Sequence, residues 1–258
     1  FISGKFEQFQ QNSPYSALKS AFEKWLDLSL TLPKATLVDL RKKLCKTLGG
    51  NARALTDFMP DFRILLGDLP PIPNLGGQES QARFHWVLQQ FVQLITQDQP
   101  IVLFIDDLQW ADHGTLNLLP NLFENSGLRL LVIVAYRDNE VDLHHPAMMM
   151  LNKLDKPASD IKTIHFSRLR LQPLPLTEIE SLLSDTLHQA PQDLAELAEL
   201  VGTKTEGNPF FTLEFLKTLY TEKLLNFDLE LQTWSWNLAA IQAQSITDNV
   251  VELMLQKM

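Results

Sequence analysis

The sequence predicts an α/β fold, in which helices flank a parallel sheet and a region of helices follows. Two apolar runs, the unbroken 101–105 and 128–135 with one charged residue near its start, fit strands that are covered on both faces, as strands of parallel sheets usually are. Segments with helical spacing separate the predicted strands, which favours right-handed βαβ units. From Leu171 onward the pattern changes to helices alone, so the sheet belongs to the first part of the chain.

The segment before the first apolar run predicts a short strand and several helices. The chain opens with a strand over 1–6 and a polar loop, and helices follow over 15–32 and 37–48, the second stopped by Gly49-Gly50-Asn51. The longest breaker-rich stretch is 66–77, which predicts an exposed loop. A strong helix comes next, with one apolar stripe formed by Phe84, Val87, Leu88, Phe91 and Ile95.

Two further elements surround the second apolar run. A helix is expected over 115–123, and Pro120 inside it should kink or shorten it. After the run at 128–135, a Met-rich helix leads to another strand near 161–166. Strand, helix and strand therefore alternate through this part of the chain.

The second part of the chain predicts helices and one hairpin. Thr177-Glu178-Ile179-Glu180 has the pattern of a capping box that opens a helix. Helices near 193–201 and 210–225 follow. Segments 224–227 and 232–236 then flank a short polar link, which is typical of a hairpin.

Composition narrows the classes of function. Of 258 residues, 22 are basic and 31 acidic, and the net charge of −9 argues against a broad contact with a nucleic-acid backbone. The single cysteine, Cys45, excludes an internal disulfide framework and a cysteine-rich zinc site, and it suits a reducing cytoplasm. No apolar stretch approaches the length of a membrane span.

Two carboxylates end the first apolar run. Asp106 and Asp107 are expected at the sheet edge where α/β proteins bind ligands. This is the design of a Walker B element, in which one acid holds Mg²⁺ and its neighbour polarises the attacking water, so the expected sheet is like that of P-loop NTPases. The two acids would also suit the start of the following helix, which they would cap. From this pattern alone both interpretations stay open.

A phosphate loop is absent from the sequence. Such a loop needs G-x-x-x-x-G-K-[ST], because backbone N–H groups must wrap the phosphates while a lysine and a hydroxyl meet charge and metal. The Gly4-Lys5 pair is followed by Phe6 and lacks the earlier glycine. The chain also begins without Met and ends within a helical pattern over 250–255, so we expect it to be a segment of a larger protein.

Three motifs in order resemble the STAND branch of AAA+ ATPases. They are Ile105-Asp106-Asp107-Leu108-Gln109-Trp110-Ala111-Asp112, Ala135-Tyr136-Arg137-Asp138 and Gly207-Asn208-Pro209-Phe210-Phe211. Nearly end to end, the chain is similar to the Orc1-like AAA ATPase module of large bacterial signalling proteins, which join it to a serine/threonine kinase domain, a GAF sensor and a histidine kinase. In that family the Walker A loop lies just upstream of the strand that begins here.

The resemblance implies ATP and Mg²⁺ as cofactors and gives roles to five residues. Asp106 would hold Mg²⁺, in part through water. Asp107 would orient or activate the hydrolytic water, and Arg137 would sense the γ-phosphate. Gly207 and Pro209 would form the GxP motif, whose proline packs against adenine and couples a helical lid to the nucleotide. Many AAA+ ATPases have Glu where Asp107 stands. The shorter side chain of Asp107 implies slow ATP hydrolysis, which suits a switch more than a motor.

Each of these residues also has a plainer interpretation. Arg137 suits a surface ion pair with Asp138 or Glu140, which would contribute little energy. Gly207-Asn208-Pro209 suits an ordinary turn that ends a helix. Arg83, which is placed to reach a neighbour's nucleotide, is better explained as a solvated helix residue.

The resemblance divides the chain into three parts and predicts what it does. Residues 1–170 would form the nucleotide-binding core without its Walker A strand and loop, 171–223 the lid, and 224–258 a hairpin and the start of a winged-helix-like region. The expected function is an ATP-binding and ATP-hydrolysing regulatory switch of a signal-transduction protein kinase, with an incomplete nucleotide site in this fragment. The expected location is cytoplasmic.

The resemblance also implies partners, and two other classes of function remain as alternatives. The expected partners are ATP, the kinase, GAF and histidine kinase domains of the same polypeptide, and a further copy through self-association; neither nucleic acid nor a membrane span is expected. The alternative is a non-catalytic protein-interaction scaffold with a degenerate NTPase fold. A third hypothesis is a winged helix that binds DNA, which the net charge of −9 disfavours.

Overall fold

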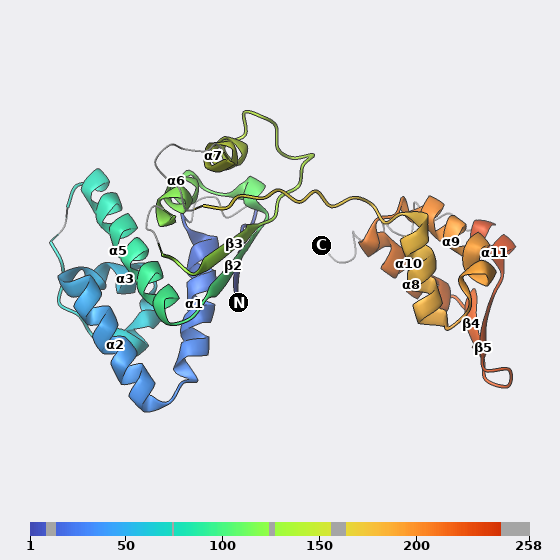
Figure 1. Ribbon diagram of the computed structural model, residues 1–258, viewed down its shortest axis with the longest axis horizontal. Helices are drawn as coiled ribbons and strands as arrows, with labels where there is room; N and C mark the ends of the chain where they lie inside the picture. The colour runs from blue at the N-terminus through green and yellow to red at the C-terminus, as the bar shows by residue number, and fades with distance from the viewer. Residues whose placement is uncertain (9–13, 74, 124–126, 156–163, 244–258) are drawn as a thin grey trace. The chain divides into compact units, whose positions relative to one another are not determined.

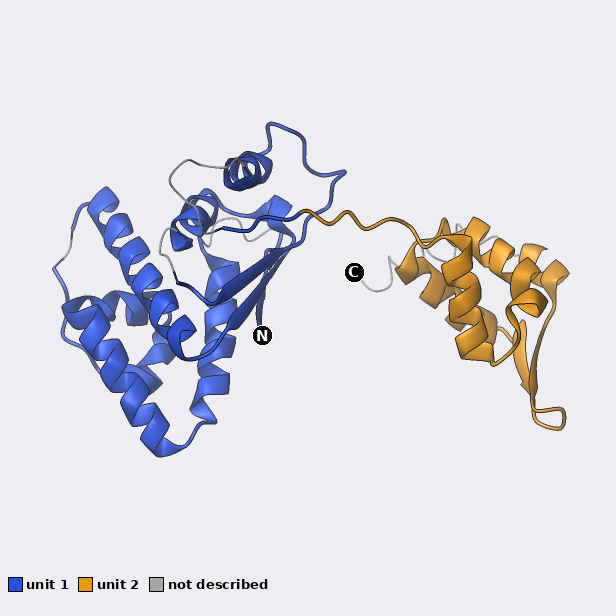
Figure 2. Ribbon diagram, in the orientation of Figure 1, with its two compact units in different colours: residues 1–167 blue, residues 168–258 orange. Residues whose placement is uncertain are grey.

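The computed structural model describes residues 1–8, 14–73, 75–123, 127–155 and 164–243. The chain divides into two compact units, Phe1–Ser167 and Arg168–Met258, which Figure 2 shows in blue and orange.

Unit 1 is built on a three-stranded parallel sheet. Its strands, in the spatial order β1-β2-β3, are β1 (Ile2–Lys5), β2 (Ile101–Asp106) and β3 (Leu130–Val134) (Figure 1). The register pairs Lys5 with Asp106 and Ile105 with Val134, so the carboxyl ends of the strands meet at one edge. Three of the four strands that the sequence predicts for this region are confirmed, and so is a parallel sheet with flanking helices.

Seven α-helices are found in the described part of unit 1. They are α1 (Ser16–Leu30), α2 (Lys34–Leu48), α3 (Ala52–Phe58), α4 (Arg63–Leu66), α5 (Gly77–Asp98), α6 (His113–Leu122) and α7 (Pro146–Asp155), with short 3-10 turns at Gly49–Asn51, Pro60–Phe62 and Leu108–Trp110. The long helix with the apolar stripe is confirmed as α5. Pro120 lies inside α6, which ends two residues later, in line with the expected shortening.

The two faces of the sheet differ in burial. Side chains alternate along a strand, and Leu103 and Ile105 of β2 are buried in the core together with Phe22 of α1. On the opposite face, Leu131 and Ile133 of β3 are 56% and 42% exposed. Because parallel sheets are usually covered on both faces, this second apolar face is unusual.

Unit 2 has its own core. Its elements are α8 (Leu176–Leu187), α9 (Pro191–Thr205), α10 (Pro209–Thr221), the antiparallel hairpin of β4 (Leu225–Asp228) and β5 (Thr233–Trp236), and α11 (Leu238–Ala243). The buried core residues are Ile179, Leu183, Leu187, Leu194, Leu197, Ala198, Val201, Phe215, Leu219, Leu225 and Ile241. The hairpin is confirmed, whereas the assignment of the parts as a lid and a winged-helix-like region stays a prediction.

Some local predictions were wrong. Helix α8 begins at Leu176, and Pro175 takes the N-cap position without a side-chain cap, so the capping box at 177–180 does not form. The extended backbone of Pro175 sets the start of the helix two residues earlier than the box requires. Residues 164–166 are not in a strand; the remainder of the strand expected near 161–166 lies outside the described residues, and so does the helical pattern over 250–255.

Two helices of unit 2 also end at other residues than the sequence predicts. Helix α10 ends at Thr221, and Leu225, which the sequence placed in that helix, belongs to β4. Helix α9 continues to Thr205, into the segment that the sequence treated as a link. Both shifts are common for boundaries that depend on tertiary packing.

The close approach of β1 to α1 gives a stability prediction. A Cβ atom on Gly4 would lie 1.8 Å from the backbone oxygen of Ala17, and backbone cannot move away as a flexible side chain can. We expect Gly4→Ala to lower the free energy of unfolding by about 3 kcal/mol, at the upper end of typical overpacking costs. Chemical denaturation of both proteins measures this difference.

The matched control is Gly50→Ala, since nothing lies within 4 Å of a Cβ atom at that position. This control should leave the denaturation midpoint close to that of the unchanged chain. Equal midpoints for the Gly4 and Gly50 variants would contradict the close packing of α1 on β1.

Candidate functional site

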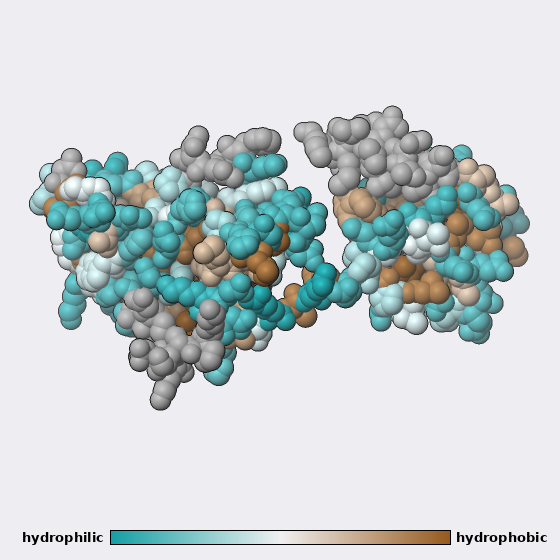
Figure 3. All heavy atoms as spheres, turned by 90° about the horizontal axis from the view of Figure 1, so that it is seen from above, coloured by the Kyte–Doolittle hydropathy of each residue, from teal (hydrophilic) through white to brown (hydrophobic). Residues whose placement is uncertain are grey.

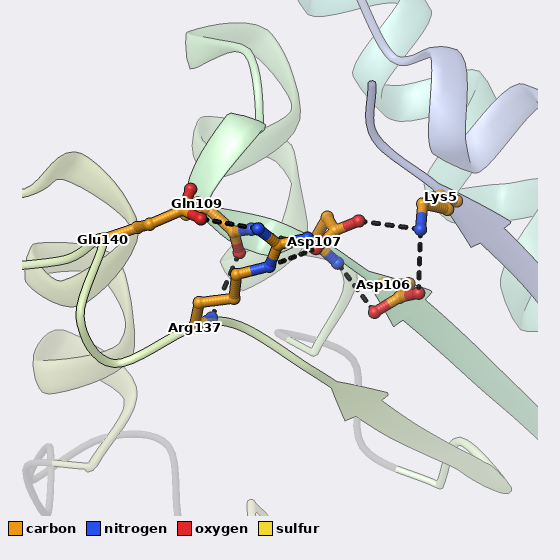
Figure 4. Close-up of polar contacts among 6 residues, drawn as sticks. All are labelled: Lys5, Asp106, Asp107, Gln109, Arg137 and Glu140. Atoms are coloured by element: carbon orange, nitrogen blue, oxygen red, sulfur yellow. Dashed lines mark hydrogen bonds and ion pairs between the residues drawn. The ribbon is translucent and has the colours of Figure 1, made fainter. Parts of the chain in front are cut away.

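The candidate site lies at the carboxyl edge of the parallel sheet. Asp106 is the last residue of β2, and Lys5, its partner in the register, is the last residue of β1. Asp107 follows with φ 52° and ψ 47°, a left-handed conformation that aspartate tolerates better than most residues. Arg137 follows the end of β3. Figure 4 shows these side chains converging on Asp107.

A lysine bridges the two carboxylates. The Nζ atom of Lys5 lies 2.8 Å from Oδ2 of Asp107 and 3.5 Å from Oδ2 of Asp106. The side chain of Asp107 is 7% exposed, whereas that of Lys5 is 59% exposed. A nearly buried carboxylate thus has a cationic partner that reaches it from the solvent side. The sequence did not single out Lys5, except to reject it as a phosphate-loop lysine.

Gln109 joins the loops that follow β2 and β3. Its Nε2 donates a hydrogen bond to Oδ1 of Asp107 at 2.9 Å, and its Oε1 accepts one from the backbone N–H of Arg137 at 3.3 Å (Figure 4). The side chain is buried. The sequence gave Gln109 no role, although the residue lies inside the first motif.

Arg137 contacts both Glu140 and Asp107, and its role as a sensor of the γ-phosphate stays a prediction. Its Nη1 forms an ion pair with Glu140 at 2.8 Å, which is the plainer interpretation. Its Nε also lies 3.6 Å from Oδ1 of Asp107, and its guanidinium lies over the ring of Trp110, 5.2 Å from the ring centroid. A fixed positive charge therefore stands beside the acidic pair.

The helix-cap interpretation of the two carboxylates is wrong. The N-cap of α6 is Asp112, whose Oδ1 accepts a hydrogen bond from the backbone N–H of Thr115 at 2.9 Å. Asp112 also accepts one from the N–H of Tyr15. Oδ1 of Asp106 accepts a 3.0 Å hydrogen bond from the N–H of Asp107, and its other oxygen faces Lys5. Asp107 occupies the N-cap position of the 3-10 turn Leu108–Trp110, but its side chain makes no capping hydrogen bond there, so neither carboxylate caps a helix.

The charges around Asp107 hold it in the ionised form. Burial raises the pKa of its carboxyl, but the contact with Lys5 and the hydrogen bond from Gln109, with the charges of Lys5 and Arg137, outweigh burial and lower the pKa below its usual 3.8. The pKa of Lys5 is raised in turn, first of all by its contact with Asp107. Asp107 is therefore a carboxylate, and Lys5 an ammonium, at neutral pH.

The acidic pair suits a magnesium ion. Oδ2 of Asp107 is buried and accepts no hydrogen bond, so it is directed at the cation of Lys5 alone. Oδ2 of Asp106, on a side chain that is 38% exposed, faces the same point. Mg²⁺ takes one or two carboxylates and keeps several waters, so this pair fits it. Among the described residues there is no group of three or more metal-ligating side chains.

Gly207 and Pro209 belong to unit 2. Gly207 has φ +69°, its carbonyl accepts a hydrogen bond from the N–H of Leu174 at 2.7 Å, and a Cβ there would lie 2.5 Å from the Leu174 oxygen. Asn208 caps α10 and Pro209 is its first residue. The segment thus has the geometry of a turn between helices, and its contact with adenine stays a prediction.

Arg83 lies in α5, as expected, but it is less solvated than expected. It is half-buried, and its Nη1 donates a 2.9 Å hydrogen bond to the carbonyl of Pro73. This contact ties α5 to the loop that precedes it. No described helix is long and apolar enough to cross a membrane.

Comparison with known proteins identifies the family. The family model for the AAA ATPase domain matches residues 1–134. The Hybrid signal transduction histidine kinase G of Dictyostelium discoideum is 29% identical over 323 aligned residues, which cover 100% of this chain and 9% of that protein. The Peroxide stress-activated histidine kinase mak2 of Schizosaccharomyces pombe is 23% identical over 255 residues, or 89% of this chain and 10% of that protein.

A second yeast kinase matches less of the chain. The Peroxide stress-activated histidine kinase mak3 of Schizosaccharomyces pombe is 22% identical over 157 residues, which cover 61% of this chain and 6% of that protein. The chain thus spans a tenth or less of the length of these relatives. No solved structure matches it significantly.

The ion pair of Lys5 and Asp107 predicts a pH dependence. Because the folded pKa of Asp107 is lowered, its charge stabilises the fold above about pH 4, the usual aspartate pKa, and this stabilisation is lost as the pH falls through the folded pKa. Lys5→Met removes the ammonium, so the pKa of Asp107 should rise and the loss should begin at higher pH. Carboxyl carbon shifts in NMR titrations measure the pKa.

Lys43→Met serves as the control, because Lys43 pairs with Asp39 and Asp98, neither of which contacts the site. The pKa of Asp107 should not change in that variant. A pKa of Asp107 that is the same with and without Lys5 would show that the ammonium does not hold this carboxylate.

Proposed function

This chain belongs to the AAA ATPase domain family, and from that premise we propose that it is the nucleotide-responsive part of a regulatory switch in a signal-transduction kinase. The similarity to three histidine kinases supports a regulatory setting. We place it in the STAND branch, on the strength of the three motifs that the sequence contains.

The cluster at the carboxyl edge of β2 carries this proposal. Asp106 and Asp107 lie beside each other, a cation already bridges them, and Arg137 stands next to Asp107. Sites for anionic ligands in open α/β sheets lie beyond the carboxyl ends of the strands, where this cluster lies. A pair of acids with a neighbouring arginine suits a complex of phosphate and metal, because the acids attract the metal ion and the arginine attracts the phosphate.

The exposure and the contacts of each residue suggest a different role for Asp106, Asp107 and Arg137 in the proposed site. Asp106, the more exposed acid, would hold Mg²⁺ in place of the Lys5 ammonium. Asp107, kept ionised and fixed by Gln109, would accept a hydrogen bond from the attacking water. Arg137 would meet the terminal phosphate. Bound Mg²⁺ would neutralise phosphate charge and polarise the phosphoryl group.

A phosphate loop must come from outside these 258 residues, since the sequence has none. The exposed apolar side chains of β3 support this part of the proposal. Leu131 and Ile133 lie on an edge strand, and a strand with its own helix would cover both the edge and this face. We therefore place the phosphate loop on a segment that adds to the sheet at β3.

Calorimetric titration of Mg·ATP tests the proposal. This chain alone should bind weakly or not at all, whereas a chain extended upstream through a phosphate loop should bind tightly. Asp106→Asn in the extended chain should weaken Mg²⁺-dependent binding by about tenfold or more, since a metal-bound carboxylate is lost.

Asp98→Asn is the control, because Asp98 is an exposed acid at the end of α5 and pairs with Lys43 instead. Binding by that variant should equal that of the extended chain. If neither the short nor the extended chain binds Mg·ATP, the protein-interaction scaffold becomes the better account of the fold.

A separate prediction concerns turnover. In the extended chain, Asp107→Asn should reduce ATP hydrolysis by about 100-fold or more while Mg·ATP still binds, because the amide cannot act as a base. Phosphate release under saturating ATP measures the rate. Hydrolysis at an unchanged rate would mean that Asp107 does not act on the attacking water.

A further inference from the structure

A cavity lies at the amino edge of the parallel sheet, where β1 and β2 begin, and Asp107 lies at the other edge. The cavity has a volume of about 280 Å³, and Ile2 and Ile101, the first residues of these strands, form part of its wall. Most of the remaining wall comes from α1, α2 and the end of α5. Pockets for small molecules have volumes from about 300 Å³ upward, so this cavity suits only a small organic ligand.

The wall that α1 contributes is mainly apolar. Trp25, Leu28, Ser29 and Leu32 recur at intervals of three and four residues, so they share one side of the helix and of the turn after it. Leu28 is 57% exposed and Leu32 is 39% exposed. Single exposed apolar residues are common, and Figure 3 shows such residues among hydrophilic ones. Leu28 and Leu32 differ because they line one cavity, where the apolar part of a ligand would cover both.

A buried hydroxyl group lines the same cavity. Ser29 is 6% exposed, and its Oγ donates a 2.8 Å hydrogen bond to the carbonyl of Trp25. A serine hydroxyl has one hydrogen and two lone pairs, so this oxygen can still accept a hydrogen bond but has no hydrogen left to donate. A ligand that bonds to Ser29 must therefore supply the hydrogen.

Two carboxylates and one ammonium lie on the solvent side of the cavity. The Nζ atom of Lys43 lies 3.2 Å from Oδ2 of Asp39 and 3.1 Å from Oδ2 of Asp98, and all three side chains line the cavity. They are the charged side chains among the described lining residues, so one negative charge has no positive partner there. Asp98 is also the last residue of α5, where the helix dipole favours a cation.

We propose that this cavity binds a small hydrophobic amine in its protonated form. The apolar body of the amine would cover Leu28 and Leu32, and its ammonium would donate hydrogen bonds to acceptors among Ser29, Asp39 and Asp98. An ammonium has three donors and no acceptor, which matches this set of groups. An anion would meet the unmatched negative charge and a hydroxyl that cannot donate to it. The proposal goes beyond the nucleotide site and does not rest on it.

NMR titration of the full chain with three related probes tests the proposal. Phenethylamine, phenethyl alcohol and hydrocinnamate share a phenylethyl body and differ in the charge of the head group. The amine should bind with a dissociation constant of about 1 mM or lower, and about tenfold or more tightly than the alcohol or the carboxylate. It should shift the indole signal of Trp25 and leave that of Trp86, which does not line the cavity, in place.

Charge variants separate the carboxylates from the lysine. Asp39→Asn/Asp98→Asn should weaken binding of the amine by about tenfold and leave binding of the alcohol unchanged. Lys43→Met removes the cation that competes for both acids, so it should tighten binding of the amine by about threefold. Asp57→Asn is the matched control, because Asp57 forms an exposed i,i+4 ion pair with Arg53, as Asp39 does with Lys43, but does not line the cavity. It should bind the amine like the unchanged chain.

The buried acceptor has a test of its own. Ser29→Ala should weaken binding of the amine by about fivefold, since one hydrogen bond is lost. Circular dichroism verifies that each variant folds.

Three results would overturn the proposal. The first is the absence of a shift at Trp25 on addition of the amine, and the second is an amine that binds no more tightly than the alcohol or the carboxylate. The third is binding that disappears in the chain extended upstream, since Phe1 also lines the cavity and a segment before it would then fill the space. Failure to bind Mg·ATP would leave all three results unaffected, so the two proposals stand or fall separately.

Discussion

The ion pair between Lys5 and Asp107 is the contact on which the candidate site depends. A carboxylate that is 7% exposed is costly to keep ionised unless opposite charge and hydrogen bonds compensate it. Lys5 supplies the nearest charge, Gln109 supplies a hydrogen bond, and Arg137 adds a second charge. Because these partners come from the ends of β1, β2 and β3, the three strands must end together for the carboxylate to stay ionised.

Backbone geometry brings these side chains together. The left-handed conformation of Asp107 turns the chain sharply after β2, and the N–H of Leu108 then reaches the carbonyl of Ala135 at 2.9 Å. That backbone contact joins the loops after β2 and β3, and Gln109 adds a side-chain contact between them. The position of Arg137 therefore follows from the turn at Asp107, so the second motif is placed by the first.

The sequence predicted correctly those features that depend only on residues close together in the chain. The buried strands, the apolar stripe of α5 and the paired carboxylates at the end of β2 all follow from runs and spacings of a few residues. The role of Lys5 was not predicted, because it arises when β1 pairs with a strand about 100 residues away, and a single sequence does not reveal that pairing. The capping box failed because Pro175 set the start of α8, and the cap of α6 is Asp112 instead of either of the two acids expected to supply it.

The unequal exposure of the two partners decides how the site can respond to a metal ion. Asp107 is fixed by burial and by Gln109. The side chain of Lys5, in contrast, is 59% exposed, and its ammonium is the end of a long, flexible side chain at the end of β1. A cation that enters between the acids can displace the ammonium into solvent, because the incoming positive charge then compensates the nearly buried Asp107 carboxylate in its place. The carboxylates need not move or change their protonation state. Within the proposed function, metal binding therefore exchanges one cation for another at a preformed acidic pair, and Lys5 preserves that pair until the exchange occurs.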